Sequence, residues 1–163
     1  MDLPLFFWYD VVRYEKRTTE GFYMNILFFL TPKEKVAHTD TDDTLRQALE
    51  KMEHHGYSAI PLLDLDGKYV GTITEGDMLW YIKDNDFPSL KDMEDISILD
   101  VERKRDNEAV NISVSMDELV NKITNQNFVP VVDDHNVFIG IITRKDVILY
   151  LANKEMIENK IVS

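Results

Sequence analysis

The chain repeats itself, and this repeat limits the folds it can adopt more than any other feature. Shifting the sequence by 69 positions aligns residues 61–81 with residues 130–150, and 7 of these 21 positions are identical. Apolar positions between the identities also match in type. Such self-similarity indicates a duplicated structural unit. The identical pairs are Pro61/Pro130, Asp64/Asp133, Gly71/Gly140, Ile73/Ile142, Thr74/Thr143, Asp77/Asp146 and Tyr81/Tyr150.

The first copy reads as strand, helix, strand, strand, helix. Leu45, Ala48, Leu49 and Met52 follow the spacing of one helix face, and Gly56 is placed to end that helix. Asp66 and Gly67 are typical of a tight hairpin turn. The expected elements are a strand at 36–39, a helix at 45–52 capped from 42–44, strands at 58–63 and 68–74, and a helix at 75–82.

The second copy has the same order. The sequence from Ser115 to Glu118 is typical of a capping box that opens a helix. The other expected elements are strands at 109–112, 128–132 and 137–142, with a turn at 133–136, and a helix at 144–152. One half alone has little core, so we expect an α/β (α+β) fold in which two β-α-β-β-α units pack sheet to sheet with pseudo-twofold symmetry.

The segments outside the repeat differ in composition. Residues 1–23 are rich in aromatics and then polar, without helical or strand periodicity. Two interpretations stay open: they precede an original start at Met24 and are non-native, or they are a genuine extension whose aromatic side chains pack on the body. The expected divisions are an N-terminal extension at 1–23, a first unit at 24–84, a connector at 85–102, a second unit at 103–153 and a C-terminal tail at 154–163.

Composition excludes several classes of function. The chain has 18 basic and 30 acidic residues and a formal charge of −12, which disfavours binding to a nucleic-acid backbone. It has no cysteine, and its histidines lack metal-ligand spacing. No apolar run has the length of a membrane span, and the apolar start is a poor signal peptide. We expect a cytoplasmic protein with no metal, no catalytic residues, and no nucleic-acid or membrane partner.

The motif Gly-x-Ile-Thr-x-x-Asp stands at a strand-to-helix junction in both copies, at 71–77 and at 140–146. Seen once, Thr-x-x-Asp favours a helix cap and nothing more. The same geometry also suits a nucleotide. A helix N-terminus favours a phosphate, and an ionised aspartate accepts the two hydroxyl hydrogens of a ribose.

These two junctions, the strand at 57–64 and the Asp-Gly hairpin, doubled in order and at matching spacing, resemble a pair of CBS domains. This family is named after cystathionine beta-synthase, and such a pair is called a Bateman module. The resemblance covers about residues 24–152. It implies a disc with two clefts, a homodimer, and an adenosyl ligand such as AMP, ADP, ATP or S-adenosylmethionine.

The resemblance also implies roles for individual positions. Asp77 and Asp146 would hold ribose hydroxyls, and Thr74 and Thr143 would contact phosphate or ribose. The apolar members of the remaining set fit an ordinary core equally well. By the same resemblance, that set would border the adenine pockets, with further contacts from Thr39 and Ile112; it comprises Tyr57, Ser58, Ala59, Ile60, Asn127, Phe128 and Val129.

The two copies differ in charge between Thr and Asp. The first has Glu75-Gly76, and the second has Arg144-Lys145. One charge about 4 Å from a phosphate is worth on the order of 4 kcal/mol at an effective dielectric constant near 20, before screening. We therefore expect the second unit's cleft to tolerate phosphates, and the first to be empty or to hold an uncharged portion. The basic run Arg103–Arg105 could assist, although a solvated surface is the simpler interpretation.

The favoured hypothesis is a non-enzymatic regulatory module that binds an adenine nucleotide and acts on an unknown effector protein. One alternative is a structural or protein-interaction CBS module with no ligand. The other is a small nucleotide-acting enzyme, which would need a general base or a bound metal.

Overall fold

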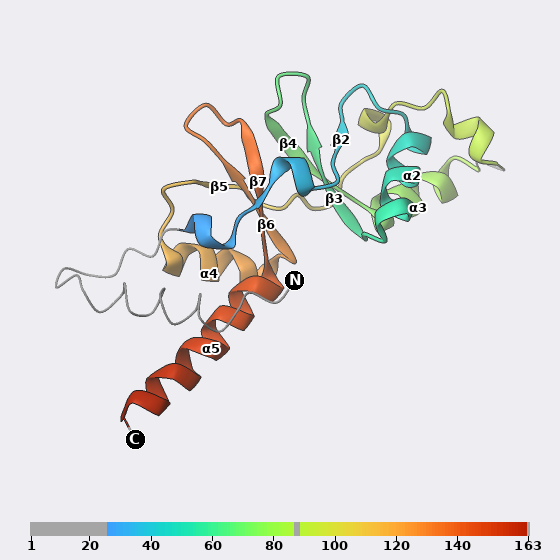
Figure 1. Ribbon diagram of the computed structural model, residues 1–163. Helices are drawn as coiled ribbons and strands as arrows, with labels where there is room; N and C mark the ends of the chain where they lie inside the picture. The colour runs from blue at the N-terminus through green and yellow to red at the C-terminus, as the bar shows by residue number, and fades with distance from the viewer. Residues whose placement is uncertain (1–25, 87–88, 163) are drawn as a thin grey trace.

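The computed structural model describes residues 26–86 and 89–162, with the stretch from 154 onward as backbone only (Figure 1). The N-terminal extension expected at 1–23 lies outside the described residues. No helix in the described ranges is both long and apolar enough to span a membrane.

The duplicated sequence forms two units of the same design, as the repeat predicts (Figure 1). The first unit contains β2 (Thr39–Asp40), α2 (Leu45–His55), β3 (Ala59–Leu63), β4 (Tyr69–Thr74) and α3 (Glu75–Asp84). The second contains β5 (Val110–Asn111), α4 (Met116–Asn125), β6 (Phe128–Val132), β7 (Phe138–Thr143) and α5 (Arg144–Val162). The α/β class and the two β-α-β-β-α units are thus confirmed.

Four short 3-10 helices and one further strand complete the described chain. The strand, β1, spans Thr31–Pro32 and precedes the first unit. The helices are η1 (Ile26–Phe29), η2 (Lys33–Lys35), η3 (Leu90–Met93) and η4 (Ile98–Asp100).

Equivalent strands of the two sheets pair in the same register. The order is β2-β3-β4 in one sheet and β1-β7-β6-β5 in the other. Thr39 lies opposite Leu62 in the first, as Val110 lies opposite Val131 in the second. The added strand β1 pairs antiparallel with β7, so the segment before the first unit completes the sheet of the second.

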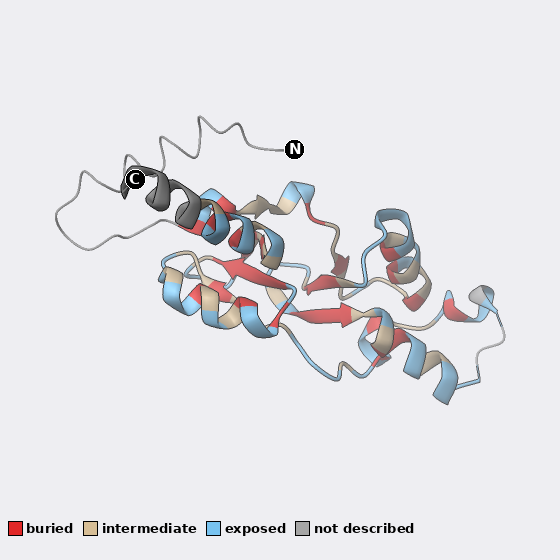
Figure 2. Cartoon of the chain, turned by 90° about the horizontal axis from the view of Figure 1, so that it is seen from below, coloured by how far each residue is buried: buried red, intermediate tan, exposed pale blue. Residues whose placement is uncertain are grey.

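Each unit has its own apolar core between sheet and helices (Figure 2). In the first, Leu45 and Ala48 of α2 pack against Ile60 and Ile73 of the sheet. The strands in the middle of the molecule are buried, whereas the outer faces of the helices are exposed. The core therefore fixes where the ends of β3, β4, β6 and β7 lie, and these ends build the site.

Helix ends follow the sequence signals. Thr44 accepts a hydrogen bond from the Gln47 N–H, and its own N–H donates to the Gln47 side chain. Gly56 ends α2 with φ of +65°, a left-handed conformation that glycine adopts without a Cβ penalty. Ser115 caps α4 by accepting from the Glu118 N–H, but the described residues show no return bond from the Ser115 N–H to the Glu118 side chain, so the expected capping box is only half formed.

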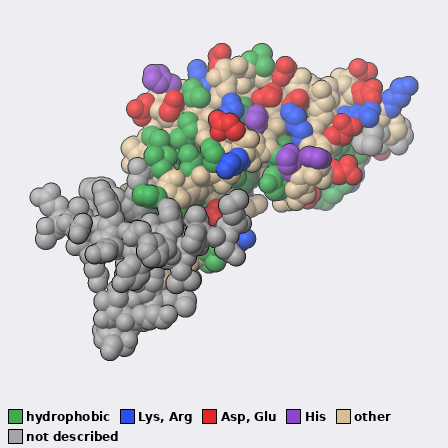
Figure 3. Space-filling view, in the orientation of Figure 1, with side chains coloured by type: hydrophobic (Ala, Val, Ile, Leu, Met, Phe, Trp, Pro, Cys, Tyr) green, Lys and Arg blue, Asp and Glu red, His purple; other side chains and the backbone are tan. Residues whose placement is uncertain are grey.

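The units meet along their hairpins. Lys68 and Val137 form an isolated antiparallel bridge, and the Phe138 N–H donates to the Gly67 carbonyl at 2.9 Å. The rings of Tyr69 and Phe138 lie 6.4 Å apart. Acidic side chains lie at the ends of both hairpins, among other side chains (Figure 3), and the turns contain Asp64, Asp66, Asp133 and Asp134.

Several element boundaries differ from those expected. The strand expected at 36–39 begins only at Thr39, because parallel pairing starts where β3 offers Leu62, while Val36 packs beside Leu63 and Phe138. The strand expected at 109–112 is limited to Val110–Asn111. Helix α5 continues to Val162 rather than ending at 152. Strand β1 carries too few residues for a periodic signal and is missed by sequence analysis.

Candidate functional site

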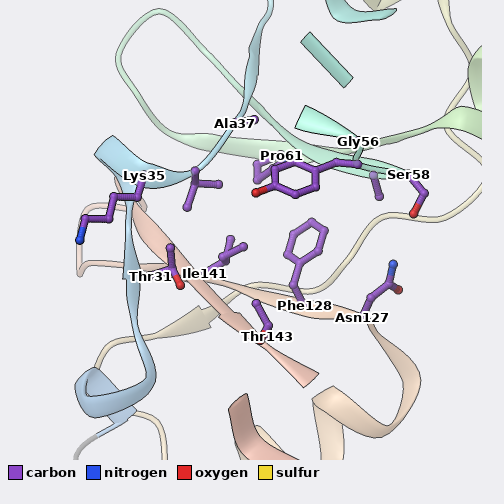
Figure 4. Close-up of a pocket in the computed structure, with 13 residues that line it drawn as sticks. Thr31, Lys35, Ala37, Gly56, Ser58, Pro61, Asn127, Phe128, Ile141 and Thr143 are labelled. Atoms are coloured by element: carbon purple, nitrogen blue, oxygen red, sulfur yellow. The ribbon is translucent and has the colours of Figure 1, made fainter. Parts of the chain in front are cut away.

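A pocket of about 320 Å³ lies between the two units. One wall is the turn after α2 together with the start of β3, and the facing wall is the start of β6 and the end of β7 (Figure 4). The segment from β1 to Ala37 closes one side. The lining residues are Thr31, Lys35, Val36, Ala37, Gly56, Tyr57, Ser58, Ala59, Pro61, Asn127, Phe128, Ile141 and Thr143.

The first unit places an aromatic side chain at this pocket. After the left-handed Gly56, the Tyr57 N–H donates to the Met52 carbonyl, which turns the chain sharply into β3. The Tyr57 side chain is 46% exposed, and its ring stacks on His55 with centroids 5.5 Å apart. An exposed aromatic face beside a pocket suits a flat, apolar ring of a ligand.

The second unit contributes the start of α5. Thr143 lines the pocket, and its hydroxyl donates to Oδ2 of Asp146 at 2.5 Å. The Asp146 N–H donates back to the Thr143 hydroxyl at 3.2 Å, which caps the helix. Asp146 is half-buried, and its Oδ1 accepts no hydrogen bond from any residue that the structure describes. One carboxylate oxygen therefore has no partner among the described residues, although Asp146 itself, unlike Thr143, is not one of the residues that line the pocket.

The cations of this helix start are placed differently from each other. Nε of Arg144 donates to the carbonyls of Ile123 and Gln126, at 2.9 and 3.1 Å. Arg144 thus holds the end of α4, while Lys145 is exposed. Neither lines the pocket as described.

Lys35 lines the pocket, and sequence analysis did not single it out. It is exposed and makes no hydrogen bond or ion pair with any described residue. Sequence analysis also missed six further lining residues, which are Thr31, Val36, Ala37, Gly56, Pro61 and Ile141. The signal that would have found the segment 31–37 is its place directly before the first strand, because β1 leads it across to the second unit.

The first unit's motif is bonded to other parts of the described chain. Asp77 is 4% exposed, and its Oδ2 accepts from both the N–H and the hydroxyl of Thr74, at 3.1 and 2.7 Å. Its Oδ1 accepts from the backbone N–H of Lys104 at 3.0 Å. The structure therefore brings Thr143 to the pocket, but keeps Thr74 and Asp77 in contact with the chain itself.

The remaining expected residues divide between pocket and core. Tyr57, Ser58, Ala59, Asn127 and Phe128 line the pocket. Ile60 and Val129 point into the two cores, and Ile112 packs against the second core. Thr39 is fully buried and donates to Asp43 at 2.7 Å. These four do not line the pocket, because alternate strand positions face the cores.

Comparisons with known proteins place this architecture. The CBS domain family matches residues 30–84 and 98–153. Cyclic di-AMP receptor B of Bacillus subtilis is 29% identical, over 78% of this chain and 86% of its own length. A crystal structure of CbpB in complex with c-di-AMP matches with a TM-score of 0.75 and 27% identity, covering 86% of this chain and 92% of that one.

A third match is CbpB of Listeria monocytogenes, also in complex with c-di-AMP. Its TM-score is 0.69 and its identity 28%, covering 82% of this chain and 98% of that one. Two family matches in tandem, on two units of the same topology, identify the duplication seen in the sequence. The chain therefore belongs to the CBS-domain family and carries two CBS domains.

Proposed function

We propose that this chain is a non-enzymatic regulatory protein that binds an adenine nucleotide in the pocket between its two CBS domains. The nucleotide would shift the relative orientation of the units, which both contribute walls. Its output would pass to a separate effector protein. The ligand to test first is c-di-AMP, which is bound by CbpB in the two complexes; AMP, ADP, ATP and S-adenosylmethionine follow.

The observation that carries this proposal is the pairing of Tyr57 with the start of α5 across one pocket. The Tyr57 ring and Phe128 offer apolar surface for an adenine base. The free Oδ1 of Asp146, next to Thr143, offers an acceptor for ribose hydroxyls. A volume of about 320 Å³ accommodates one nucleoside. The second half of a dinucleotide would extend beyond these walls.

Lys35 supports an anionic ligand. It lines the pocket, and none of the described acidic groups forms an ion pair with it. An ammonium group in this position gives an anion a local positive charge, in a chain whose net charge of −12 otherwise disfavours anions. We therefore assign the phosphate-binding role to Lys35 rather than to Arg144 or Lys145, which do not line the pocket.

Isothermal titration calorimetry of the full chain with c-di-AMP, AMP and adenosine tests the proposal. We expect binding of at least one adenine nucleotide and at least a tenfold loss of affinity in Asp146→Asn, because asparagine accepts fewer hydroxyl hydrogens. Absence of heat with every ligand, including ATP and S-adenosylmethionine, would leave the interaction module without a ligand as the better interpretation.

Lys35→Gln tests the phosphate role separately. It should weaken c-di-AMP and AMP about tenfold and leave adenosine nearly unchanged. Lys33→Gln is the matched control, because Lys33 lies in the same 3-10 helix and carries the same charge but does not line the pocket. Equal losses for the two variants would assign the effect to overall charge.

We also propose that the chain forms a homodimer through α3 and α5. Trp80 of α3 is 50% exposed and Ile148 of α5 is 55% exposed, and the neighbouring Leu79 and Leu149 are exposed as well. The repeat pairs Leu79 with Ile148 and Trp80 with Leu149, so α3 and α5 expose equivalent apolar residues. A second copy related by a twofold axis could pack its own α3 and α5 against this surface. Sedimentation velocity of the wild type should show the sedimentation coefficient of a dimer. The double variant Trp80→Glu with Leu149→Glu should sediment as a monomer. Leu65→Glu, in a hairpin turn, is the control.

A further inference from the structure

The repeat allows the two clefts to be compared residue by residue. Thr39 and Val110 hold equivalent places, because one lies opposite Leu62 and the other opposite Val131. Counting back four residues from each gives Lys35 and Asp106, and counting back three gives Val36 and Asn107. In the same way, the shift between β3 and β6 makes Gln126 the equivalent of Tyr57.

Lys35, Val36 and Tyr57 line the pocket. Their three equivalents form hydrogen bonds with neighbouring segments in the first cleft, which is the corresponding place beside the motif of the first unit. Oδ1 of Asp106 accepts from the Thr72 N–H at 2.8 Å and from Nε of Arg103 at 2.9 Å. The carboxylate of Asp106, although exposed on one side, thus bonds directly to the backbone of β4.

Asn107 and Gln126 continue this set of hydrogen bonds, which we call the seal of the first cleft, to the second unit. Nδ2 of Asn107 donates to the Phe128 carbonyl at 3.0 Å. Gln126, only 8% exposed, accepts from the Glu108 N–H at 2.9 Å and donates to the Glu108 carbonyl at 3.2 Å. The polar side chains therefore bond to connector and strand rather than facing an open space.

Tyr69 closes the same region from the hairpin side. Its hydroxyl lies 2.7 Å from the Thr72 hydroxyl and donates to the Asn107 carbonyl at 2.7 Å. Burial raises the pKa of Tyr69 well above its usual range, so the phenol stays protonated and remains a donor.

Gly71 shows how closely this segment lies on the strand. A Cβ at this position would be 2.3 Å from Oδ1 of Asp106 and 2.8 Å from Nε of Arg103. The segment 103–107, which follows the connector, therefore occupies the space along β4. Its Lys104 N–H also takes the carboxylate oxygen of Asp77 that the corresponding Asp146 leaves available.

We infer that residues 103–107 are a built-in occupant of the first cleft, with Asp106 as the residue that decides which cleft binds, so that each chain takes at most one nucleotide. This inference rests on the proposed function for the pocket but adds a stoichiometry and a specificity-determining residue. It also assigns Asp77 a structural role, although the sequence motif around it matches that of Asp146.

Calorimetric titration of the full chain with c-di-AMP and with AMP measures the stoichiometry. We expect at most one ligand per chain for each. Asp77→Asn should leave the dissociation constant within twofold of the wild type, whereas Asp146→Asn should raise it at least tenfold. Two AMP molecules per chain, or a tenfold loss in Asp77→Asn, would overturn the inference while leaving the proposed function intact.

A measurement without ligand separates the two proposals. Hydrogen exchange of the Lys104 amide should be slowed at least a hundredfold in the wild type, and Asp106→Ala should accelerate it at least tenfold. Asp42→Ala, at an exposed position before α2, is the control and should change nothing. A Lys104 amide that exchanges at the unfolded rate refutes the seal, whether or not any nucleotide binds. A protected amide in a protein that binds no nucleotide supports the seal and rejects only the proposed function.

Discussion

Oδ1 of Asp77 accepts a hydrogen bond of 3.0 Å from the backbone N–H of Lys104, a residue 27 positions further along the chain. This contact joins the start of α3 to the segment that opens the second half of the sequence. The same seven-residue motif thus has two structural outcomes in one molecule. At the start of α5 the motif borders a pocket through Thr143, whereas at the start of α3 its aspartate binds the backbone of residue 104.

The variant Gly71→Ala tests how tightly the segment 103–107 lies against β4. The new methyl group would collide with the side chains of Asp106 and Arg103, so we expect a loss of about 1 to 2 kcal/mol in the free energy of unfolding. In an Asp106→Ala background the same change should cost less than about 0.5 kcal/mol, because the nearest obstacle is gone. Urea denaturation of the four proteins in this cycle measures the coupling. Additive costs would show that Asp106 is not the obstacle.

The equivalent glycine of the second unit should respond differently. A Cβ on Gly140 would be 2.2 Å from the backbone oxygen of Thr31. The backbone of a paired strand cannot change its conformation as a side chain can. Gly140→Ala should therefore lower the free energy of unfolding by about 3 kcal/mol, because it breaks the pairing of β1 with β7. Thr31→Ala, which keeps the backbone oxygen, should rescue none of this loss. A rescue would place the obstacle in the side chain instead.

The repeat and its periodicity predicted the element order because strand and helix patterns depend on local spacing and on one buried face. Helix α2 and the hairpin turn at Gly67 are examples, since their caps and positive φ follow from single residues. The β1 strand could not be predicted. It has two residues, and its pairing with β7 is set by tertiary contacts far along the chain.

The site shows the same division. Tyr57, Asn127, Phe128 and Thr143 were expected at the site and line the pocket. The motif alone could not distinguish Asp77 from Asp146, because the difference lies in Lys104 and Asp106, outside the motif. Nor could it show that Arg144 bonds to two carbonyls of the preceding helix end. Contacts between segments distant in sequence leave no periodic trace.

Arg144 and Lys145 are adjacent cations, and we expect their removal to differ strongly in its effect on stability. Arg144→Ala should lower the free energy of unfolding by about 2 kcal/mol, because it leaves the carbonyls of Ile123 and Gln126 without their charged donor. Lys145→Ala, at an exposed position, should stay within about 0.5 kcal/mol of the wild type. Thermal unfolding followed by circular dichroism compares the two. Equal midpoints would show that the Arg144 contacts add no stability.

Asp43 should make the first unit sensitive to acid. Burial raises the pKa of this carboxyl, but hydrogen bonds from Lys51, the Asp40 N–H and Thr39 outweigh burial and hold the pKa below its ordinary value of 3.8. The folded state therefore binds the proton less readily than the unfolded state. The stabilisation is complete above the unfolded pKa of about 3.9 and is lost as the pH falls through the folded pKa.

Urea midpoints of the wild type and of Asp43→Asn, measured from pH 6 to pH 2, test this dependence. The midpoint of the wild type should fall more steeply below pH 4, and the two curves should converge in acid, because a protonated Asp43 no longer pairs with Lys51. Asp42→Asn is the control, because Asp42 is the exposed neighbour of Asp43 in the same turn and should follow the wild type. If Asp43→Asn also runs parallel to the wild type over this range, the acid sensitivity arises from other carboxyl groups.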